Sequence, residues 1–441
     1  MQLDVISKFS SFFFIGIGGV SMSGLAKYML GLGKQVGGSD VSSSEYVEEL
    51  AKCGAKINLN DNVEDISGYD FIVYTDAVSD NDLRYKKALE LNKPLMSRGQ
   101  FLYEVSKNFK TVIAVSGCHG KTTCTAMLAH IFAAADKKFT AHIGGRDLAF
   151  SNFYCCGHDF FITEACEYKK NFLHLKPDVS VVLNSELDHV ECYGSEEALK
   201  KAYVDFAESA VHKVALYNDL PISGITFGFA NDADYFADDI KVNGGNSIFT
   251  VYERGEKECE VTLNVYGKHN ILNALAATAV ARTLGISYEH ISDGLNLFKG
   301  VERRFEKLAE VKNTVYYADY AHHPNELLAS LKTVRAIAKG NIFVVFQPHT
   351  YSRTKLLFDN FIDVLSPLKN LLIYKTFAAR EYFDDAGSAL TLAQNIRNAD
   401  YGDCVDDIRD FISKAKEGDV VIFLGAGDIY FIAKQICGEL N

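Results

Sequence analysis

The sequence predicts an α/β protein built on parallel sheets, and two observations carry that prediction. A unit of apolar strand, glycine-rich turn and helix occurs three times, each in a different third of the chain, with strands at residues 12–15, 111–115 and 420–424. Between these units, short apolar runs alternate with helical patterns, which is typical of parallel sheets covered by helices. At 441 residues the chain is too long for one hydrophobic core, so we expect two or three domains.

The first unit predicts a site for a nucleotide diphosphate. Its strand at 12–15 runs into a glycine loop, a helix is expected over 25–32, and the next strand ends on an acidic residue, as in dinucleotide-binding folds. The third glycine of that fingerprint is replaced by Ser21, so the loop fits either NAD or another nucleotide diphosphate. The candidate binding residues are Gly16, Gly18, Gly19, Ser39 and Asp40.

The second unit predicts an ATP site. After the strand at 111–115, the run Ser-Gly-Cys-His-Gly-Lys-Thr-Thr opens onto a helix, so backbone N–H groups and a lysine can surround a polyphosphate. The common P-loop has an earlier glycine, whose place is taken here by Val115. An oxidoreductase does not need a second phosphate loop. The presence of both loops therefore counts against interpreting the first as an NAD site. The candidate residues are Gly117, Cys118, His119, Gly120, Lys121, Thr122 and Thr123.

Two further strands end in residues that could ligate a metal ion. The strand at 159–163 is followed by Glu164, and the strand at 179–183 by a segment that reaches His189. Ligands of parallel sheets gather at the carboxyl ends of the strands, so both side chains could complete a Mg²⁺ site with Thr122. The alternatives are a solvated carboxylate and a histidine that makes a local hydrogen bond.

The rest of the chain offers polar groups at strand and helix ends. We expect antiparallel hairpins over residues 223–265, followed by an alanine-rich helix. Any of the polar groups alone could be a helix cap or a loop residue. The candidates in this part are His269, Asn273, Arg304, Asp319, His322, His349 and Arg353.

Composition narrows the class of partner and the compartment. The net charge of −12 argues against nucleic acid, and we expect small-molecule partners. Ten scattered cysteines without a C-x-x-C pair predict neither a disulfide framework nor a zinc site, and favour a reducing cytoplasm. The apolar run after Lys8 ends in glycines rather than in a cleavage site, so we interpret it as a strand and expect no membrane association.

These motifs, in this order and over essentially the whole chain, resemble the Mur ligase family. The short G-x-x-G-K-T-T loop suits that family, and the elements His322-His323-Pro324 and Gln347-Pro348-His349 are most similar to the branch that joins L-alanine to UDP-N-acetylmuramate. The resemblance implies three domains: a Rossmann-like UDP-substrate domain (1–104), a central P-loop ATPase domain with a parallel sheet (105–302) and a Rossmann-like domain that binds the amino acid (303–441).

The resemblance also implies a reaction in peptidoglycan precursor synthesis, and hence a part in cell-wall biogenesis, cell shape and cell division. The γ-phosphoryl group of ATP passes to the lactyl carboxylate of UDP-N-acetylmuramate, and the amine of L-alanine attacks the acyl phosphate. By the same resemblance Lys121 binds the β- and γ-phosphates, Thr122 and Glu164 ligate Mg²⁺, His189 binds a second Mg²⁺, and His269 and Asn273 meet the adenine. Arg304, Asp319, His322, His349 and Arg353 position the phosphate and the amino acid.

Besides Ser21, which replaces the usual third glycine of the first loop, three positions depart from the family pattern. Cys166 and Ala318 each replace an aspartate, and Thr350 replaces an arginine, so contacts with the amino acid depend more on Arg353. Two alternatives stay open: a recycling ligase that attaches a murein tripeptide to the same sugar nucleotide, and, more remotely, an NAD(P)-dependent oxidoreductase. We expect a monomer or a homodimer.

Overall fold

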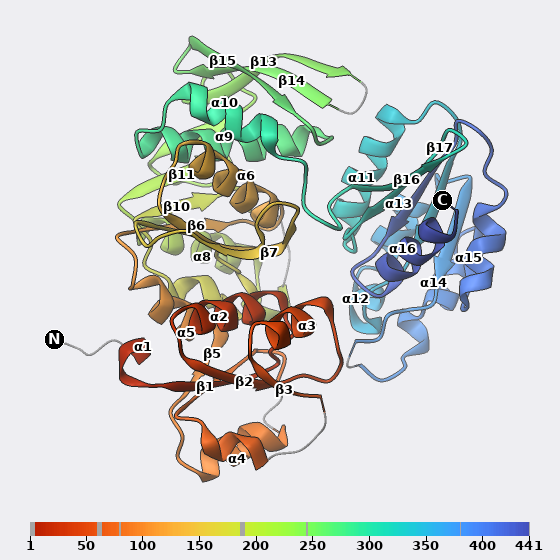
Figure 1. Cartoon of the computed structure of the whole chain (residues 1–441). Coiled ribbons are helices and arrows are strands. Elements are labelled where there is room, and N and C mark those ends of the chain that lie inside the picture. Colours follow the sequence, from red (N-terminus) through yellow and green to blue (C-terminus); the bar gives the residue numbers. More distant parts are fainter. Residues whose placement is uncertain are drawn as a thin grey trace. The chain divides into compact units, whose positions relative to one another are not determined.

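The computed structural model describes residues 5–59, 64–78, 81–185, 190–243, 246–379 and 381–440. The chain divides into two compact units, the first ending at Lys299 and the second beginning at Gly300, with Val265–Gly267 also part of the second (Figure 1). Three sheets lie within them, two in the first unit and one in the second. The α/β class with parallel sheets is therefore confirmed.

The first sheet has five parallel strands in the order β3-β2-β1-β4-β5, the Rossmann-like arrangement that the sequence predicted. Its central strand is buried on both faces: Phe12 and Phe14 belong to one core and Phe13 and Ile15 to another. The strands are β1 (Ser11–Ile15), β2 (Gln35–Ser39), β3 (Lys56–Asn58), β4 (Phe71–Tyr74) and β5 (Leu95–Ser97). The helices are α1 (Val5–Lys8), α2 (Val20–Gly31), α3 (Glu45–Lys52), η1 (Glu64–Gly68), α4 (Leu83–Glu90) and α5 (Arg98–Ser106).

Helix α2 begins at Val20, five residues before the predicted start at 25. The prediction was wrong because it assigned Gly24 to the glycine loop. In the structure Gly24 lies inside the helix, where a Cβ atom would come within 2.8 Å of the His142 ring. This glycine therefore allows α2 to pack closely against strand β7 (Phe139–Asp147), and Figure 1 shows α2 lying between the first sheet and that strand.

The second sheet has ten strands in the order β15-β14-β13-β12-β11-β10-β6-β9-β7-β8. Its middle is parallel, whereas β7 with β8 and β14 with β15 form antiparallel ladders. The predicted hairpin region is only partly antiparallel, because β12 extends the parallel ladder of β11. The strands not yet given are β6 (Thr111–Ser116), β8 (Ser151–Cys155), β9 (Phe160–Glu164), β10 (Val179–Val182), β11 (His212–Leu216), β12 (Ile225–Gly228), β13 (Tyr235–Asn243), β14 (Asn246–Glu253) and β15 (Glu256–Leu263).

Helices on this sheet carry the loops of interest. Helix α6 directly follows β6, and α9 packs beside it. The helices are α6 (Lys121–Ala134), η2 (Tyr168–His174), α7 (Val190–Tyr193), α8 (Glu196–Glu208), α9 (Lys268–Thr283) and α10 (Tyr288–Leu297).

The first and second sheets share one hydrophobic core. Phe12, Phe14 and Phe101 from the first part of the chain pack in the same cluster as Phe161 and Phe172 from the second. Apolar side chains from residues before and after the predicted boundary at residue 104 are therefore buried together. This shared burial stabilises the two sheets as one unit. The bounds 1–104, 105–302 and 303–441 stay a prediction.

The third sheet has six strands in the order β16-β17-β21-β18-β19-β20, with β16 antiparallel to β17 and the others parallel. Alternate residues of β18 enter separate cores on the two faces. The strands are β16 (Glu306–Val311), β17 (Thr314–Asp319), β18 (Ile342–Phe346), β19 (Asn370–Tyr374), β20 (Ala399–Gly402) and β21 (Val420–Leu424). The helices are α11 (Pro324–Ile337), α12 (Tyr351–Leu356), α13 (Phe358–Leu365), η3 (Asp385–Gly387), α14 (Ala389–Gln394), α15 (Val405–Ile412) and α16 (Ile429–Leu440).

Candidate active site

The loop between β6 and α6 has the backbone geometry of an anion cradle. Gly117 has φ +136° and Gly120 has φ +86°, a region that side chains rarely tolerate. A Cβ atom at Gly120 would also lie 2.4 Å from Oδ1 of Asn273. The loop feeds into the N-terminus of a 14-residue helix, where unpaired N–H groups attract phosphate. The residues present therefore fit a polyphosphate.

Asn184, just after β10, holds this loop in place. Its side chain accepts a hydrogen bond from the N–H of His119 and donates one to the carbonyl of the same residue, each at 3.0 Å. The N–H of Cys118 donates to the backbone carbonyl of Asn184. The sequence showed Asn184 only as the residue after a predicted strand and gave it no role. Its hydrogen bonds with the loop form because β6 and β10 are neighbours in the sheet.

Lys121 lies at the start of α6 and bonds to the loop and to a carboxylate. Its Nζ donates to the carbonyl of Gly117, to the carbonyl of Cys118 at 3.0 Å, and to Glu167, whose oxygens lie 3.0 and 3.1 Å away. Burial lowers the pKa of the Lys121 ammonium, but the charge of Glu167, helped by the nearby Cys166 and Cys118, outweighs it, so the pKa is raised. Lys121 is therefore a buried cation with an anionic partner that the sequence analysis did not assign.

The candidate metal ligands lie on neighbouring elements. Glu164 ends β9, whose register pairs it with Val115 of β6, and Thr122 is buried in the first turn of α6. The Glu164 carboxylate accepts a hydrogen bond from the N–H of Gly144. A hydroxyl and a carboxylate are hard oxygen donors of the kind that Mg²⁺ prefers, so these two residues fit that ion. His189, the third predicted ligand, lies outside the described residues.

At the start of α9, the structure brings one of the two predicted adenine contacts to the loop. Asn273 is buried against Gly120 and donates a hydrogen bond to Oδ1 of Asn270 at 3.3 Å. His269 lies one turn earlier in α9 and is exposed. Asn273 therefore faces the phosphate loop itself.

The first glycine loop is closed by the acidic residue that the fingerprint assigns to a ribose. Oδ2 of Asp40 accepts a hydrogen bond from the N–H of Gly18 at 2.8 Å, and the N–H of Gly16 donates to the carbonyl of Ser39. Within the described part of the chain, the Ser39 hydroxyl is buried without a hydrogen-bond partner. Gly19 caps α2 without a side-chain bond, so N–H groups at that helix start can meet an anion.

In the second unit, the polar end of β17 contains a half-buried carboxyl group. Asp319 accepts a hydrogen bond from the hydroxyl of Ser330. Burial raises the pKa of Asp319, whereas the Ser330 bond and the Arg304 charge act in the opposite direction. The Arg304 guanidinium lies 5.1 Å from the ring centre of Tyr320.

The neighbouring Arg303 has a structural role. Its Nη2 donates to the carbonyls of Ala426 and Gly427, both at 2.9 Å, and its guanidinium lies over the Tyr320 ring at 4.8 Å. Gln347 of the Gln-Pro-His element accepts a hydrogen bond from the N–H of Ile429, the first residue of α16 directly after that loop. The third glycine turn of the sequence is therefore bound by protein side chains.

His322 and His349 come together, with ring centres 5.6 Å apart. Nδ1 of His322 lies 2.9 Å from the carbonyl oxygen of Tyr320, and Nδ1 of His349 lies 3.4 Å from Nη1 of Arg353. Burial, then the charges of His322 and Arg353, lower the pKa of His349 to about 4. A guanidinium only donates, so the neutral His349 accepts at Nδ1 and carries its proton on Nε2.

The turn between His349 and Arg353 is strained. Thr350 has φ +66°, an unfavourable conformation for a β-branched residue, and it precedes helix α12. Glu381, which the sequence analysis missed, accepts hydrogen bonds from the N–H of Ser352 at 2.9 Å and from its hydroxyl. Glu381 is distant in the chain and carries no motif, so only the fold reveals its role in holding this turn.

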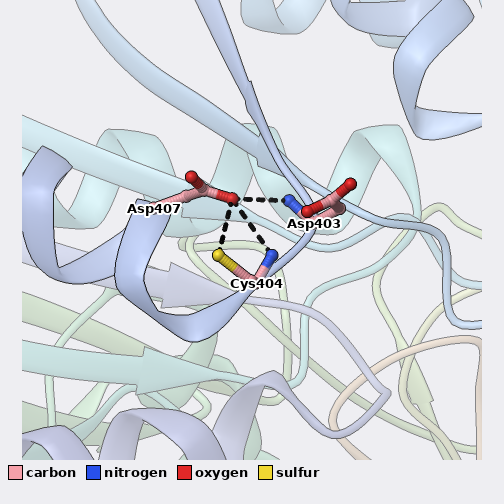
Figure 2. A group of neighbouring side chains, drawn as sticks. All are labelled: Asp403, Cys404 and Asp407. Atoms are coloured by element: carbon pink, nitrogen blue, oxygen red, sulfur yellow. Dashed lines mark hydrogen bonds between the residues drawn. The ribbon is translucent and has the colours of Figure 1, made fainter.

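A separate group of possible metal ligands lies at the start of α15. Figure 2 shows Asp403, Cys404 and Asp407 together. The Asp407 carboxylate accepts hydrogen bonds from the N–H of Asp403 at 2.9 Å and of Cys404 at 3.0 Å, and from the Cys404 thiol at 3.2 Å. These bonds from the half-buried Asp407 cap the helix, which accounts for the group as a helix start.

Protein-family models match most of the chain in three consecutive segments. Residues 11–110 match the model "Mur ligase family, catalytic domain", and residues 115–281 match "Mur ligase middle domain". Residues 303–427 match "Mur ligase, glutamate ligase domain".

Individual proteins agree with these models. The UDP-N-acetylmuramate–L-alanine ligase of Clostridium acetobutylicum is 39% identical over 97% of both chains, and that of Clostridium novyi is 38% identical over 96% of both. The solved UDP-N-acetylmuramate–alanine ligase of Thermotoga maritima is similar in structure, with a TM-score of 0.85, 26% identity, and coverage of 97% of this chain and 98% of its own. The murein peptide ligase of Psychrobacter arcticus shares the fold, with a TM-score of 0.75, 23% identity and 98% coverage of both chains. This chain belongs to the Mur ligase family.

Proposed function

We propose that the protein is an ATP-dependent ligase that joins L-alanine to the lactyl carboxylate of UDP-N-acetylmuramate, in the synthesis of peptidoglycan precursors. The observation that carries the proposal is the 39% identity, over 97% of both chains, to a ligase of that name, with the glycine loop and its Lys121 intact. A carboxylate is a poor electrophile, and phosphorylation by ATP makes it reactive toward an amine.

The nucleotide half of the reaction is assigned to the loop around Lys121. Its N–H groups and the Lys121 ammonium bind the phosphates and offset the charge that develops during phosphoryl transfer. Thr122 and Glu164 would hold Mg²⁺, and His189 is the predicted ligand of a second Mg²⁺. When bound, that ion neutralises charge on the β- and γ-phosphates. Asn273 orients the nucleotide against Gly120, and His269 approaches the adenine.

The amino-acid half is assigned to the end of the third sheet. Arg353 binds the alanine carboxylate, and Arg304 binds the phosphate that leaves the acyl group. The neutral His349 donates from Nε2 to an oxygen of the acyl phosphate, while Asp319 and His322 position the amine. Acyl phosphates react with water, so closure of the site is part of the proposal.

The sugar nucleotide is assigned to the first sheet. Its diphosphate meets the start of α2 and Gly16, Gly18 and Gly19, and the buried hydroxyl of Ser39 supplies a hydrogen-bond partner. Asp40 keeps the loop closed through Gly18. This division gives residues 1–104 to the sugar nucleotide, 105–302 to ATP and 303–441 to the amino acid.

The wider setting is proposed on chemical grounds. The reactants are small molecules, and neither nucleic acid nor a membrane is needed. No helix in the described ranges is long and apolar enough to cross a membrane. The ten cysteines are free thiols, which supports a reducing cytoplasm. A monomer or a homodimer stays the prediction.

The test is the substrate dependence of phosphate release from ATP. We expect release only when UDP-N-acetylmuramate and L-alanine are both present. Turnover with a murein tripeptide but not with L-alanine would instead establish the recycling ligase. The oxidoreductase alternative predicts thermal stabilisation by NAD or NADP, which we do not expect.

A further inference from the structure

The hydrogen-bonding capacity of the Lys121 ammonium is fully used within the protein. An ammonium has three N–H donors, and Lys121 has three acceptors: the carbonyls of Gly117 and Cys118 and the carboxylate of Glu167. A phosphate oxygen can therefore take an N–H of Lys121 only when one of these acceptors gives it up.

Glu167 is the acceptor that conflicts with a nucleotide. The two carbonyls are neutral and belong to the loop, whereas Glu167 is anionic, with a side chain 3% exposed. A carboxylate and a phosphate that share one ammonium repel each other, and the repulsion is large where water is excluded. The terminal phosphates of a nucleotide must therefore replace Glu167 rather than bind beside it.

The backbone holds Glu167 firmly in this position. Lys169 and Lys170, the second and third residues after Glu167, have positive φ of +50° and +60°. This conformation is unfavourable for lysine. The Tyr193 hydroxyl donates to the Glu167 carbonyl at 2.5 Å, so the turn is fixed despite its strain. A strained turn that is held by a buried hydrogen bond indicates that the fold fixes the position of the Glu167 carboxylate.

The same turn is bonded to the first sheet. Nδ2 of Asn171 donates to Oδ2 of Asp76 at 2.8 Å, and Nζ of Lys169 donates to the carbonyl of Asp76 at 3.1 Å. Asp76 follows β4, so it lies at the carboxyl edge of the sheet that carries the first glycine loop. Glu167 is thus positioned from both sheets of the first unit.

We propose that Glu167 is an internal competitor of the β- and γ-phosphates for Lys121, and that it thereby sets the affinity of the loop for ATP and ADP. The proposal rests on the proposed function, because it takes Lys121 as a ligand of those phosphates. In the nucleotide-free protein Glu167 keeps the buried ammonium paired. Nucleotide binding exchanges one anion for another, so part of the binding free energy is spent on breaking the Lys121–Glu167 pair.

The proposal predicts an increase in affinity on removing a buried charge. Glu167→Gln retains the size of the side chain but leaves Lys121 without an anionic partner in the nucleotide-free protein, which destabilises that state and not the complex. We expect ATP and ADP to bind about tenfold more tightly, a change of about 1.4 kcal/mol at 25 °C. AMP lacks both terminal phosphates, so its affinity is expected to be unchanged.

The experiment is isothermal titration of the full chain with ATP, ADP and AMP in the presence of Mg²⁺. Glu167→Asp is expected to tighten ATP binding less than Glu167→Gln, because its shorter side chain keeps the negative charge. Glu208→Gln is the matched control: it removes the ion pair with Lys213 of the same unit, at 2.5 Å, and is expected to leave all three affinities unchanged. Unchanged or weaker ATP binding by Glu167→Gln would overturn the proposal.

Two further variants separate the possible failures. Lys121→Ala is expected to weaken ATP binding by about 100-fold; if ATP bound as tightly as to the wild type, the role of Lys121 in the proposed function would be wrong and this proposal with it. If Lys121→Ala weakens ATP binding but Glu167→Gln does not tighten it, only the competition fails. Asn171→Ala removes the hydrogen bond that ties the turn after Glu167 to Asp76, without changing a charge. This variant replaces Glu167→Gln in the test if Glu167→Gln does not fold. It too is expected to tighten ATP binding, and an unchanged affinity would overturn the proposal.

Discussion

The side chain of Asn273 lies against Gly120 so closely that a Cβ atom at this glycine would come within 2.4 Å of Oδ1. Gly120 ends the phosphate loop and Asn273 belongs to α9, more than 150 residues later in the chain. The two helices that begin here, α6 and α9, pack side by side. The shape of the loop is therefore set by α9 as well as by its own glycines.

Gly120→Ala is expected to reduce kcat by more than about 100-fold. The substitution meets two obstacles, the positive φ, which costs about 1 kcal/mol for alanine, and the contact with Asn273. Gly285→Ala is the matched control, because Gly285 also has positive φ, +75°, but has no atom within 4 Å of its Cβ position. We expect that control to lose a little thermal stability and to keep its kcat. Equal losses of kcat in both variants would contradict a role of the Asn273 contact.

Glu164→Gln is expected to raise the Mg²⁺ concentration needed for half-maximal turnover by about tenfold. The amide keeps the hydrogen-bond acceptor for Gly144 but loses the charge that attracts the ion. Turnover measured against Mg²⁺ concentration checks this prediction. A titration curve identical to that of the wild type would remove Glu164 from the metal site.

His349 is expected to titrate with a pKa of about 4 in the folded protein, because it is buried beside His322 and Arg353. The unfolded chain binds a proton at this residue below pH about 6.5, whereas the folded protein does not until pH about 4. Stability is therefore lost as the pH falls between these values. NMR titration measures the pKa directly, and a value near 6.5 would contradict the prediction.

Urea unfolding at pH 7 and pH 5 tests the same linkage. His349→Gln should show a smaller loss of unfolding free energy between these pH values than the wild type. A residual loss is expected from His142, whose pKa burial also lowers to about 4. The same loss in the variant and the wild type would show that His349 does not contribute.

The paired arginines are expected to separate stability from catalysis. Arg303→Lys should lower the melting temperature by several degrees with a small change in kcat, because lysine lacks the planar guanidinium that lies over the Tyr320 ring while it bonds the two carbonyls of the loop after β21. Arg304→Lys should reduce kcat by about 100-fold at nearly unchanged melting temperature. The two variants differ only in position along the chain, so each is the control of the other. The reverse pattern would exchange their roles.

The local patterns identified most of the candidate site. Lys121, Thr122 and Gly120 could be assigned because a glycine turn between a strand and a helix imposes its geometry locally. Glu164 was found in the same way, as the polar end of an apolar strand. The start of α2 was missed, since Gly24 looks like a loop residue until β7 is known to pack against it.

The sequence by itself determined the α/β class, the position of the glycine turn between β6 and α6, and the family, because these depend on hydrophobic period and on short motifs. Only the tertiary structure decided which partners those motifs take. It closes the first loop on Asp40, assigns Arg303 to the loop after β21, and pairs Lys121 with Glu167. These contacts join residues 22 to 123 positions apart. Their formation depends on strand order and burial, which no local pattern encodes.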